Sequence, residues 1–260
     1  MLLGSLDGTI APVEELTIPV TDEGLIRGDG VFEVVRLYAG VPFALDDHFA
    51  RMRRSAETSR LPVEWATLEA EVDALLAESG PRDAALRVMA TRGGRRIALI
   101  QEIPPYPETI ALGTVTCAPT RVLDGVKSLS YCANMLCTRL AQEQGADEAL
   151  MLTPHGRVLE APTSSFFYVR DGRLTTPPLE DHILDSITRR WILSLFDVDE
   201  RPTTMDDVRA ADEAFLASTF KEALPVHAVD DLRLDAPGPV TREVGERLGA
   251  RIAEVVAATR

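Results

Sequence analysis

Apolar and polar residues alternate with a period of two in several short runs of this chain, and with a period near 3.6 in longer ones. The run at 31–38 is β-branched and aromatic, which predicts a strand, and Ala39-Gly40 predicts a turn into a second strand. Phe32, Val34 and Arg36 share one face of the first strand, because successive side chains point to opposite sides. They therefore form one surface of the predicted strand.

Two amphipathic helices follow, at 46–59, where the first residue is the expected N-cap, and at 64–79. On the first helix His48, Arg51 and Ser55 are spaced three and four residues apart, which places them along one stripe. Such a stripe is either a solvated face or a row of functional side chains. The pattern alone leaves both readings open.

A proline-rich stretch separates the first half from the second. The segments 84–92 and 96–103 predict a hairpin, and 104–108 then holds three prolines in five residues. A stretch of this composition cannot be helical. We therefore expect it to link a small α+β domain at 1–103 to a larger α+β domain at 109–260.

The second half mixes both kinds of element. Strands are predicted at 110–118, 149–152, 158–159, 174–176, 213–218, 226–229 and in the second part of 160–168, and helices at 131–144, 184–196, 204–210 and 238–258. Asp185 and Ser186 are both candidate N-caps of the second of these helices. The order lacks a regular βαβ rhythm, which predicts an α+β fold rather than a doubly wound sheet.

Lysine is almost absent. Of 27 basic residues only Lys127 and Lys221 are lysines. Arginine supplies charge but cannot act as a nucleophilic amine, since its pKa stays above about 12. Lys127 is therefore a candidate for Schiff-base chemistry. The alternative is that codon bias removed most lysines and spared two by chance.

Composition excludes several classes of function. A net charge of −14 argues against binding to nucleic acid or to anionic membranes, which require basic patches. No apolar run is long enough to span a membrane, and the first residues lack the pattern of a secretory signal. The three cysteines, Cys117, Cys132 and Cys137, have no metal-type spacing and predict reduced thiols in a cytoplasmic protein without a metal site.

Several short motifs occur in one order along most of the chain. They are Gly28–Arg36, Asp47–Ala56, Lys127-Ser-Leu, Gly145–Leu150, Glu160 before Thr-Ser-Ser-Phe-Phe, Leu184–Arg189 and Ser218–Glu222. In this order they resemble the fold-type IV pyridoxal-phosphate enzymes, namely branched-chain and D-amino acid aminotransferases and aminodeoxychorismate lyases. The resemblance implies two α+β domains with pyridoxal 5'-phosphate in the cleft between them, and a homodimer.

The resemblance also implies a role for each matching residue. Lys127 would form the internal aldimine with the cofactor and then move the α-proton as general base and acid. Glu160 would face the pyridine nitrogen and favour its protonated form, and Tyr131 would bond the ring hydroxyl. The phosphate would be bound by Arg51, by the helix start at Ser186-Ile187-Thr188, and by the Thr219 hydroxyl. Lys221 has no implied role and is interpreted as structural.

Two departures from the family pattern concern the site. Ser165 stands where the family usually has Asn, so the geometry around the cofactor is expected to differ. The D-amino acid enzymes hold the substrate carboxylate with an Arg and a His in a longer loop, whereas Arg95 and Arg96 end a short hairpin without a His. Either arginine is a candidate, as is Arg36 on the strand face that includes Phe32 and Val34.

The expected activity is an aminotransferase that moves an amino group between a small amino acid, of D- or branched-chain type, or an amine, and a 2-oxo acid. The alternative is an aminodeoxychorismate lyase that uses the same Lys127 and Glu160. A third alternative is a protein that has kept the fold without the chemistry, which the retention of Lys127 argues against. The donor, its stereochemistry and the carboxylate-binding residue are not determined by the sequence.

Overall fold

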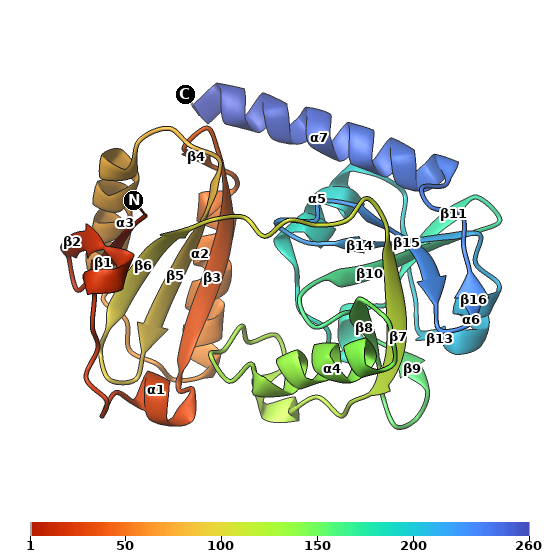
Figure 1. Ribbon diagram of the computed structural model, residues 1–260, viewed down its shortest axis with the longest axis horizontal. Helices are drawn as coiled ribbons and strands as arrows, with labels where there is room; N and C mark the ends of the chain where they lie inside the picture. The colour runs from red at the N-terminus through yellow and green to blue at the C-terminus, as the bar shows by residue number, and fades with distance from the viewer. Residues whose placement is uncertain (1, 260) are drawn as a thin grey trace. The chain divides into compact units, whose positions relative to one another are not determined.

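A computed structural model describes residues 2–259, and its contacts divide the chain into two units. Unit 1 contains the chain up to Pro104, the stretch Val126–Tyr131, and the chain from Ala253 onward. Unit 2 contains Pro105–Gly125 and Cys132–Ile252. Figure 1 shows the elements of each unit with their labels.

Unit 1 contains an antiparallel sheet. In the order of the sheet its strands are β2 (Thr9–Pro12), β1 (Leu3–Leu6), β6 (Arg96–Gln101), β5 (Ala84–Thr91), β3 (Gly30–Tyr38) and β4 (Val41–Pro42). Two short helices, η1 (Val13–Glu15) and α1 (Glu23–Arg27), lie between β2 and β3 in the chain. The predicted strand at 31–38 and the hairpin around Gly93-Gly94 are confirmed.

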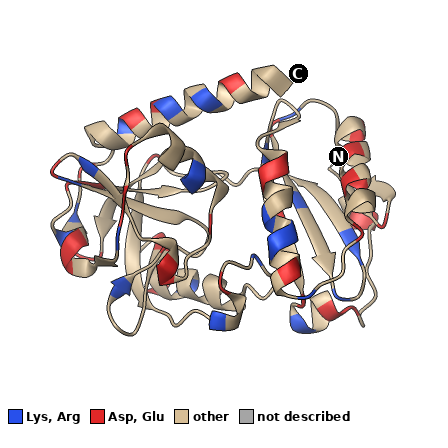
Figure 2. Ribbon diagram, turned by 180° about the vertical axis from the view of Figure 1, so that it is seen from behind, with Lys and Arg blue, Asp and Glu red and all other residues tan. Residues whose placement is uncertain are grey.

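Helices α2 (Leu45–Thr58) and α3 (Trp65–Ser79) cover one face of this sheet (Figure 1). The core consists of their apolar side chains and those of alternate strand positions, such as Val31 and Val35. The predicted N-cap of α2 was wrong, because Ala44 adopts the left-handed conformation that begins the helix. Along α2 the basic residues lie in the middle of the helix, between acidic residues near its two ends (Figure 2).

Unit 2 is built on a mixed sheet. Along its main path the order is β12 (Asp199–Glu200), β11 (Arg173–Thr176), β10 (Ser165–Arg170), β14 (Glu213–Ala217), β15 (Leu224–Val229), β7 (Ile110–Thr116), β8 (Glu148–Leu152), β9 (Arg157–Val158) and β13 (Thr203–Thr204), and β16 (Leu232–Arg233) pairs with β15. β7 runs parallel to both of its neighbours, while β10 and β14 are antiparallel. The central strands carry buried core side chains, among them Phe166, Tyr168 and Leu216.

Two of the helices of unit 2 begin at residues with capping side chains. The α-helices of this unit are α4 (Cys132–Glu143), α5 (Ile187–Leu195), α6 (Met205–Arg209) and the long α7 (Pro239–Thr259), whose last turns group with unit 1. Of the two candidate caps of α5, Ser186 is the N-cap, and its side chain accepts a hydrogen bond from the Arg189 N–H. α6 has a capping box formed by Thr204 and Asp207.

The division into units differs from the expected ranges 1–103 and 109–260. It falls after Pro104, inside the proline-rich stretch, but Val126–Tyr131 groups with unit 1. The physical reason is backbone pairing: this stretch adds to the edge of β3, with a bridge between Val31 and Ser128. The predicted α+β class is confirmed by both units. Among residues 2–259 no helix has the length and apolar character needed to cross a membrane.

Candidate active site

The stretch that contains Lys127 is held against β3 by its backbone. Phe32 N–H donates to the Lys127 carbonyl oxygen at 3.0 Å, and Leu129 N–H donates to the Gly30 carbonyl oxygen at 2.8 Å. The Lys127 N–H in turn donates to Ser55 Oγ on α2 at 3.1 Å. Two of these bonds fix the backbone of Lys127 itself and the third fixes Leu129, which orients the Lys127 side chain before any ligand binds.

Two glycines allow this close approach. Gly28 has a φ of +67°, and a side chain there would lie 2.9 Å from Ser130 Oγ. A Cβ at Gly30 would come within 2.6 Å of the Leu129 side chain and 2.5 Å of a backbone oxygen. The Gly28-Asp29-Gly30 motif is therefore required by packing against the Lys127 stretch, and not merely by a turn.

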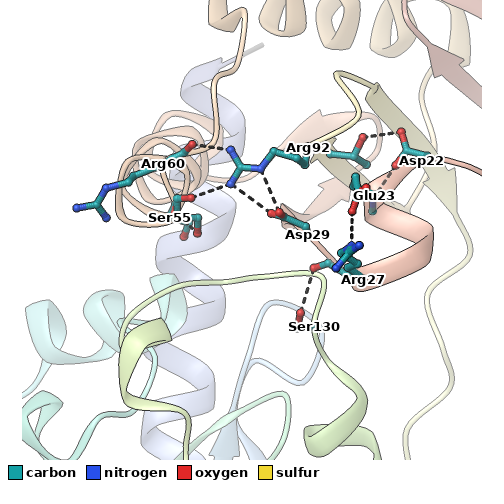
Figure 3. Close-up of polar contacts among 12 residues, drawn as sticks. Asp22, Glu23, Arg27, Asp29, Ser55, Arg60, Arg92 and Ser130 are labelled. Atoms are coloured by element: carbon teal, nitrogen blue, oxygen red, sulfur yellow. Dashed lines mark hydrogen bonds and ion pairs between the residues drawn. The ribbon is translucent and has the colours of Figure 1, made fainter.

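Arg92 anchors the same glycine turn (Figure 3). Its Nε donates to Asp29 Oδ2 at 3.0 Å, while its Nη1 and Nη2 donate to the backbone oxygens of Arg60 and Ser59 at 2.6 and 2.9 Å. Ser130 Oγ completes the arrangement by donating to the Gly28 carbonyl oxygen at 3.0 Å. The turn is thereby tied both to the end of α2 and to the Lys127 stretch.

The Lys127 amine lies beside two aromatic rings. Its Nζ is 4.5 Å from the centroid of Phe32 and 5.5 Å from that of Tyr131, and the two rings meet edge to face at 5.2 Å. Ring faces attract an ammonium group and limit the water around it. Phe32, Lys127 and Tyr131, all predicted site residues, are therefore brought together within unit 1.

A buried polar cluster lies between β3 and α2. Glu33 Oε1 accepts from Arg51 Nε, and Glu33 Oε2 accepts from Arg51 Nη2, both at 2.7 Å. His48 Nδ1 lies 2.8 Å from Glu33 Oε2, and since a carboxylate only accepts, this nitrogen carries the proton. His48, Arg51 and Ser55 are all less than 5% exposed, which excludes the solvated-face reading of this stripe.

The charges in this cluster are set by burial and pairing. Burial alone would raise the pKa of Glu33, but Arg51 and then His48 outweigh it and hold the pKa well below the ordinary range. Burial lowers the pKa of His48 against the opposing effect of Glu33, and the charges of Arg51 and Lys127 lower it further. Glu33 is therefore ionised and His48 neutral near pH 7. Glu33 was not predicted, although a lone acid in an apolar strand requires a buried cation.

Arg87 on β5 is a second residue that was not predicted. Its guanidinium carbon lies 5.4 Å from the Phe32 ring centroid, and its Nε donates to Gln101 Oε1 at 2.8 Å. Burial lowers the pKa of Arg87, an effect that Tyr131 opposes. Arg87 is opposite Val34 in the sheet, so it lies on the strand face that includes Phe32. The sequence feature that could have identified Arg87 is a single arginine in an otherwise apolar strand.

The predicted substrate-binding arginines have other contacts. Arg95 pairs with Asp7 at 2.7 Å, and Arg96 pairs with Glu71 at 2.8 Å. Arg36 stacks over the ring of Tyr38 at 5.0 Å, and its Nε is buried without a hydrogen-bond partner among the described residues. As a candidate surface for the substrate carboxylate, the geometry thus favours one strand face over the hairpin tip. This face contains Phe32, Val34, Arg36 and Arg87.

In unit 2, Glu160 is held by the next motif along the chain. Its Oε1 accepts from the Leu184 N–H at 2.9 Å, which fixes the orientation of the half-buried carboxylate. Leu184 lies just before the N-terminus of α5, where the Ile187 and Thr188 side chains are buried. The first N–H groups of a helix attract anions, so the segment 184–188 both orients the Glu160 carboxylate and provides a helix start that can bind an anion.

Ser165 and Thr219 lie at neighbouring strand ends. Ser165 begins β10 and is opposite Ala217 at the end of β14, and Thr219 follows in the next turn. Ser165 Oγ is buried and has no hydrogen-bond partner among residues 2–259. A buried hydroxyl without a partner is costly, and a bound polar group would satisfy it.

Comparison with known proteins matches residues 30–229 to the family model of amino-transferase class IV. The chain belongs to this class IV aminotransferase family. The match begins at Gly30, the last residue of the glycine turn, and includes the later motifs up to Ser218–Glu222, so the resemblance inferred from their order is confirmed.

Individual class IV relatives extend over nearly the whole chain. A D-alanine aminotransferase from Bacillus licheniformis is 30% identical and covers 97% of this chain and 98% of its own. The crystal structure of a branched-chain aminotransferase from Thermoproteus uzoniensis with norvaline has a TM-score of 0.88 and is 28% identical. The comparison covers 98% of this chain and 95% of that chain. A fold IV-transaminase from Curtobacterium pusillum has a TM-score of 0.87, with 26% identity and coverage of 96% and 99%.

The donor set of this class IV chain is consistent with a phosphorylated pyridine aldehyde. An amine can bond the aldehyde, a fixed carboxylate can pair with a ring nitrogen, and a helix start suits a phosphate. The buried hydroxyl of Ser165 without a partner indicates that a polar ligand group completes its surroundings. Among the described residues no group of His, Cys, Asp and Glu is arranged to hold a metal ion.

Proposed function

We propose that this chain is a pyridoxal 5'-phosphate-dependent aminotransferase that moves an amino group between a small D- or branched-chain amino acid, or an amine, and a 2-oxo acid. Lys127 would bind the cofactor covalently through Nζ and then carry the α-proton. The cofactor, when bound, supplies an electron-poor ring that stabilises negative charge on the substrate carbon. The names of the relatives, which are aminotransferases, favour transfer over the lyase alternative.

Other residues of the chain would hold the cofactor in one protonation state. Glu160, oriented by the Leu184 N–H, would keep the proton on the pyridine nitrogen, because an ionised carboxylate stabilises the charged ring. Tyr131 would hydrogen-bond the ring hydroxyl. The hydrogen bond from the Lys127 backbone N–H to Ser55 Oγ would keep the backbone of Lys127 in place while its side chain moves.

The phosphate would be bound by helix α5 and nearby hydroxyls. The Ile187 and Thr188 N–H groups at the helix start supply donors, and Ser186 and Thr219 supply hydroxyls. Arg51 is predicted to add a cation. Its Nε and Nη2 pair with Glu33, which fixes the orientation of the guanidinium.

We infer that Arg87 recognises a carboxylate of the substrate. It is half-buried, it lies beside the Phe32 ring that also contacts the Lys127 amine, and its guanidinium donates a hydrogen bond to the neutral amide of Gln101. A half-buried cation that has no carboxylate partner among the described residues favours an anionic ligand. Phe32 and Val34 on the same face would contact the side chain of the substrate.

The single observation that carries the proposal is the setting of Lys127. In a member of the class IV family, this rare lysine is fixed at its backbone by β3 and α2, and its amine lies beside two aromatic rings. No composition bias places a chance lysine in such surroundings.

A donor panel tests the proposal. Purified protein loaded with pyridoxal 5'-phosphate is mixed with D-alanine, L-leucine or (R)-1-phenylethylamine, and the visible absorbance of the bound cofactor is followed. Loss of the band with at least one donor, and its return on adding pyruvate or 2-oxoglutarate, is expected. An unchanged band with every donor, together with pyruvate release from aminodeoxychorismate, would establish the lyase instead.

A further inference from the structure

The second lysine of the chain is buried in unit 2 and makes several polar contacts. Lys221 is 8% exposed, and its Nζ forms an ion pair with Glu148 Oε2. The same Nζ donates to Ser164 Oγ at 2.8 Å and lies 3.5 Å from Thr163 Oγ1. Tyr106 covers the group, with its ring centroid 5.6 Å from Nζ. An amine enclosed in this way cannot reach an incoming aldehyde.

The shape of this site explains why a lysine is retained here. An ammonium group has three donors arranged around one atom, and this one has three oxygen acceptors around it. The planar fork of an arginine would not match acceptors that converge on a single point. In a chain that otherwise uses arginine, this requirement for a compact cation indicates that the geometry of the site matters.

Lys221 joins two turns at one end of the sheet. β10 and β14 are antiparallel neighbours, with Ser165 opposite Ala217, so the turn before β10 and the turn after β14 lie side by side. The first turn is closed by reciprocal backbone bonds between Ala161 and Ser164. The second contains Thr219 and is closed by the bond from the Glu222 N–H to the Ser218 carbonyl oxygen. The Lys221 side chain crosses from the second turn to the first.

We propose that Lys221 is a positioning residue for the cofactor phosphate. By fixing its own turn to Glu148 and Ser164, it holds Thr219 in the orientation in which the hydroxyl and backbone of that turn meet the phosphate. The inference rests on the proposed function, since it assumes that Thr219 binds this group. It adds a role for a side chain that makes no contact with the cofactor itself.

The test compares two ligands that differ only in the phosphate. Affinities of the cofactor-free full-length chain for pyridoxamine 5'-phosphate and for pyridoxamine are measured by fluorescence titration. Neither ligand has an aldehyde, so Lys127 cannot bond them and the readout is independent of turnover. Lys221→Met should weaken binding of the phosphorylated ligand by roughly 10–100-fold, the value of one hydrogen bond to a charged group. Binding of pyridoxamine should change less than about twofold.

Two further variants separate positioning from general loss of stability. Thr219→Val should show the same selective loss as Lys221→Met, and the double variant should lose no more than the larger single loss, because both changes act on one contact. Val208→Ala removes buried side-chain volume from α6 in the same unit and lowers the melting temperature without touching either turn. It should leave both affinities unchanged. Equal weakening of both ligands by Lys221→Met, or no weakening of either, overturns the proposal.

A milder variant covers the case in which Lys221→Met does not fold because Glu148 is left unpaired in the interior. Ser164→Ala removes one acceptor of Nζ and should weaken the phosphorylated ligand selectively, by a smaller factor. An unchanged ratio of the two affinities in that variant counts against the proposal. If the wild-type chain binds neither ligand, the proposed function itself fails, and that outcome is distinct from a failure of the positioning role.

Discussion

The two lysines of this chain lie beside two buried carboxylates, and the pairing differs. Next to the Lys127 stretch, Glu33 is bound by Arg51 and His48. In unit 2, Glu148 is bound by Lys221 itself. In unit 1 an arginine provides the ion pair to the buried carboxylate, and the Lys127 amine lies beside two aromatic rings. In unit 2 the lysine itself provides the ion pair and also donates a hydrogen bond to Ser164.

The difference shows that scarcity of lysine does not by itself identify a catalytic residue. Both lysines are retained in an arginine-rich chain, and we propose a different chemical reason for each: a reactive amine at Lys127 and a compact cation at Lys221. The residues around each Nζ distinguish the two roles.

Replacing Lys127 should have the greatest consequence. Lys127→Ala is expected to reduce turnover by roughly 10⁴-fold or more, because the covalent attachment and the proton carrier are lost together. Borohydride reduction of the loaded wild-type enzyme, followed by peptide mass spectrometry, should place the cofactor on Lys127. A label on Lys221, or substantial activity in Lys127→Ala, would reverse the assignment of the two lysines.

Removing the arginine from the Glu33 cluster should mainly affect stability. Arg51→Met leaves Glu33 ionised and buried without its main partner, so the free energy of unfolding should fall by about 3–5 kcal/mol. Arg53→Met is the matched control on the same helix, because its pair with Glu69 is partly exposed, and about 1 kcal/mol or less is expected. Urea unfolding measures both. An equal loss of unfolding free energy in the two variants would show that the buried pair contributes no more than the partly exposed pair.

Arg87 tests what the Lys127 region recognises. Arg87→Met should raise the KM for 2-oxo acids and amino acids by roughly 10–100-fold, because a charged hydrogen bond to the carboxylate is lost. The KM for an amine donor without a carboxylate, such as (R)-1-phenylethylamine, should be unchanged. Arg96→Met is the control, since that arginine is paired with Glu71. The same rise in both variants would remove Arg87 from the substrate site.

The smallest effect concerns pH. The folded-state pKa of His48 lies below its ordinary value of 6.5, so the unfolded chain binds a proton first as the pH falls. Stability is therefore present above about pH 6.5 and declines below it, until the folded-state pKa is reached. Each unit of the pKa difference corresponds to about 1.4 kcal/mol.

His48→Gln should remove this part of the pH dependence, as measured by urea unfolding between pH 8 and pH 5. His155→Gln alters an exposed histidine and should leave the profile as in the wild type. A wild-type profile that is flat across this interval would contradict the buried, neutral state of His48.

Much of the fold could be predicted because local patterns agreed with the final structure. The strand at 31–38, the hairpin around Gly93-Gly94 and the helix that ends before Gly80-Pro81 follow from periodicity and turn residues. The N-cap of α2 could not be found in this way. It depends on a left-handed Ala44, which no preference for capping side chains indicates.

The site was predicted in part, and the missing residues share one property. Lys127, Tyr131 and Phe32 were identified from motif order, and the structure brings them together. Glu33 and Arg87 were missed because their contacts are with residues distant in the chain, in α2 for Glu33 and in β3 and β6 for Arg87. A charged residue in an apolar strand signals that such a partner exists, but the sequence alone does not say which residue it is.

The pairing of Val126–Tyr131 with β3 has a consequence for biosynthesis. Until residue 131 has left the ribosome, the beginning of β3 presents unpaired backbone groups to solvent, and such an edge invites association with other chains. A truncated product that ends near the proline-rich stretch would keep that edge permanently. The nascent chain is thus open to edge-to-edge association at β3 until the stretch Val126–Tyr131 has been synthesised and added to the sheet.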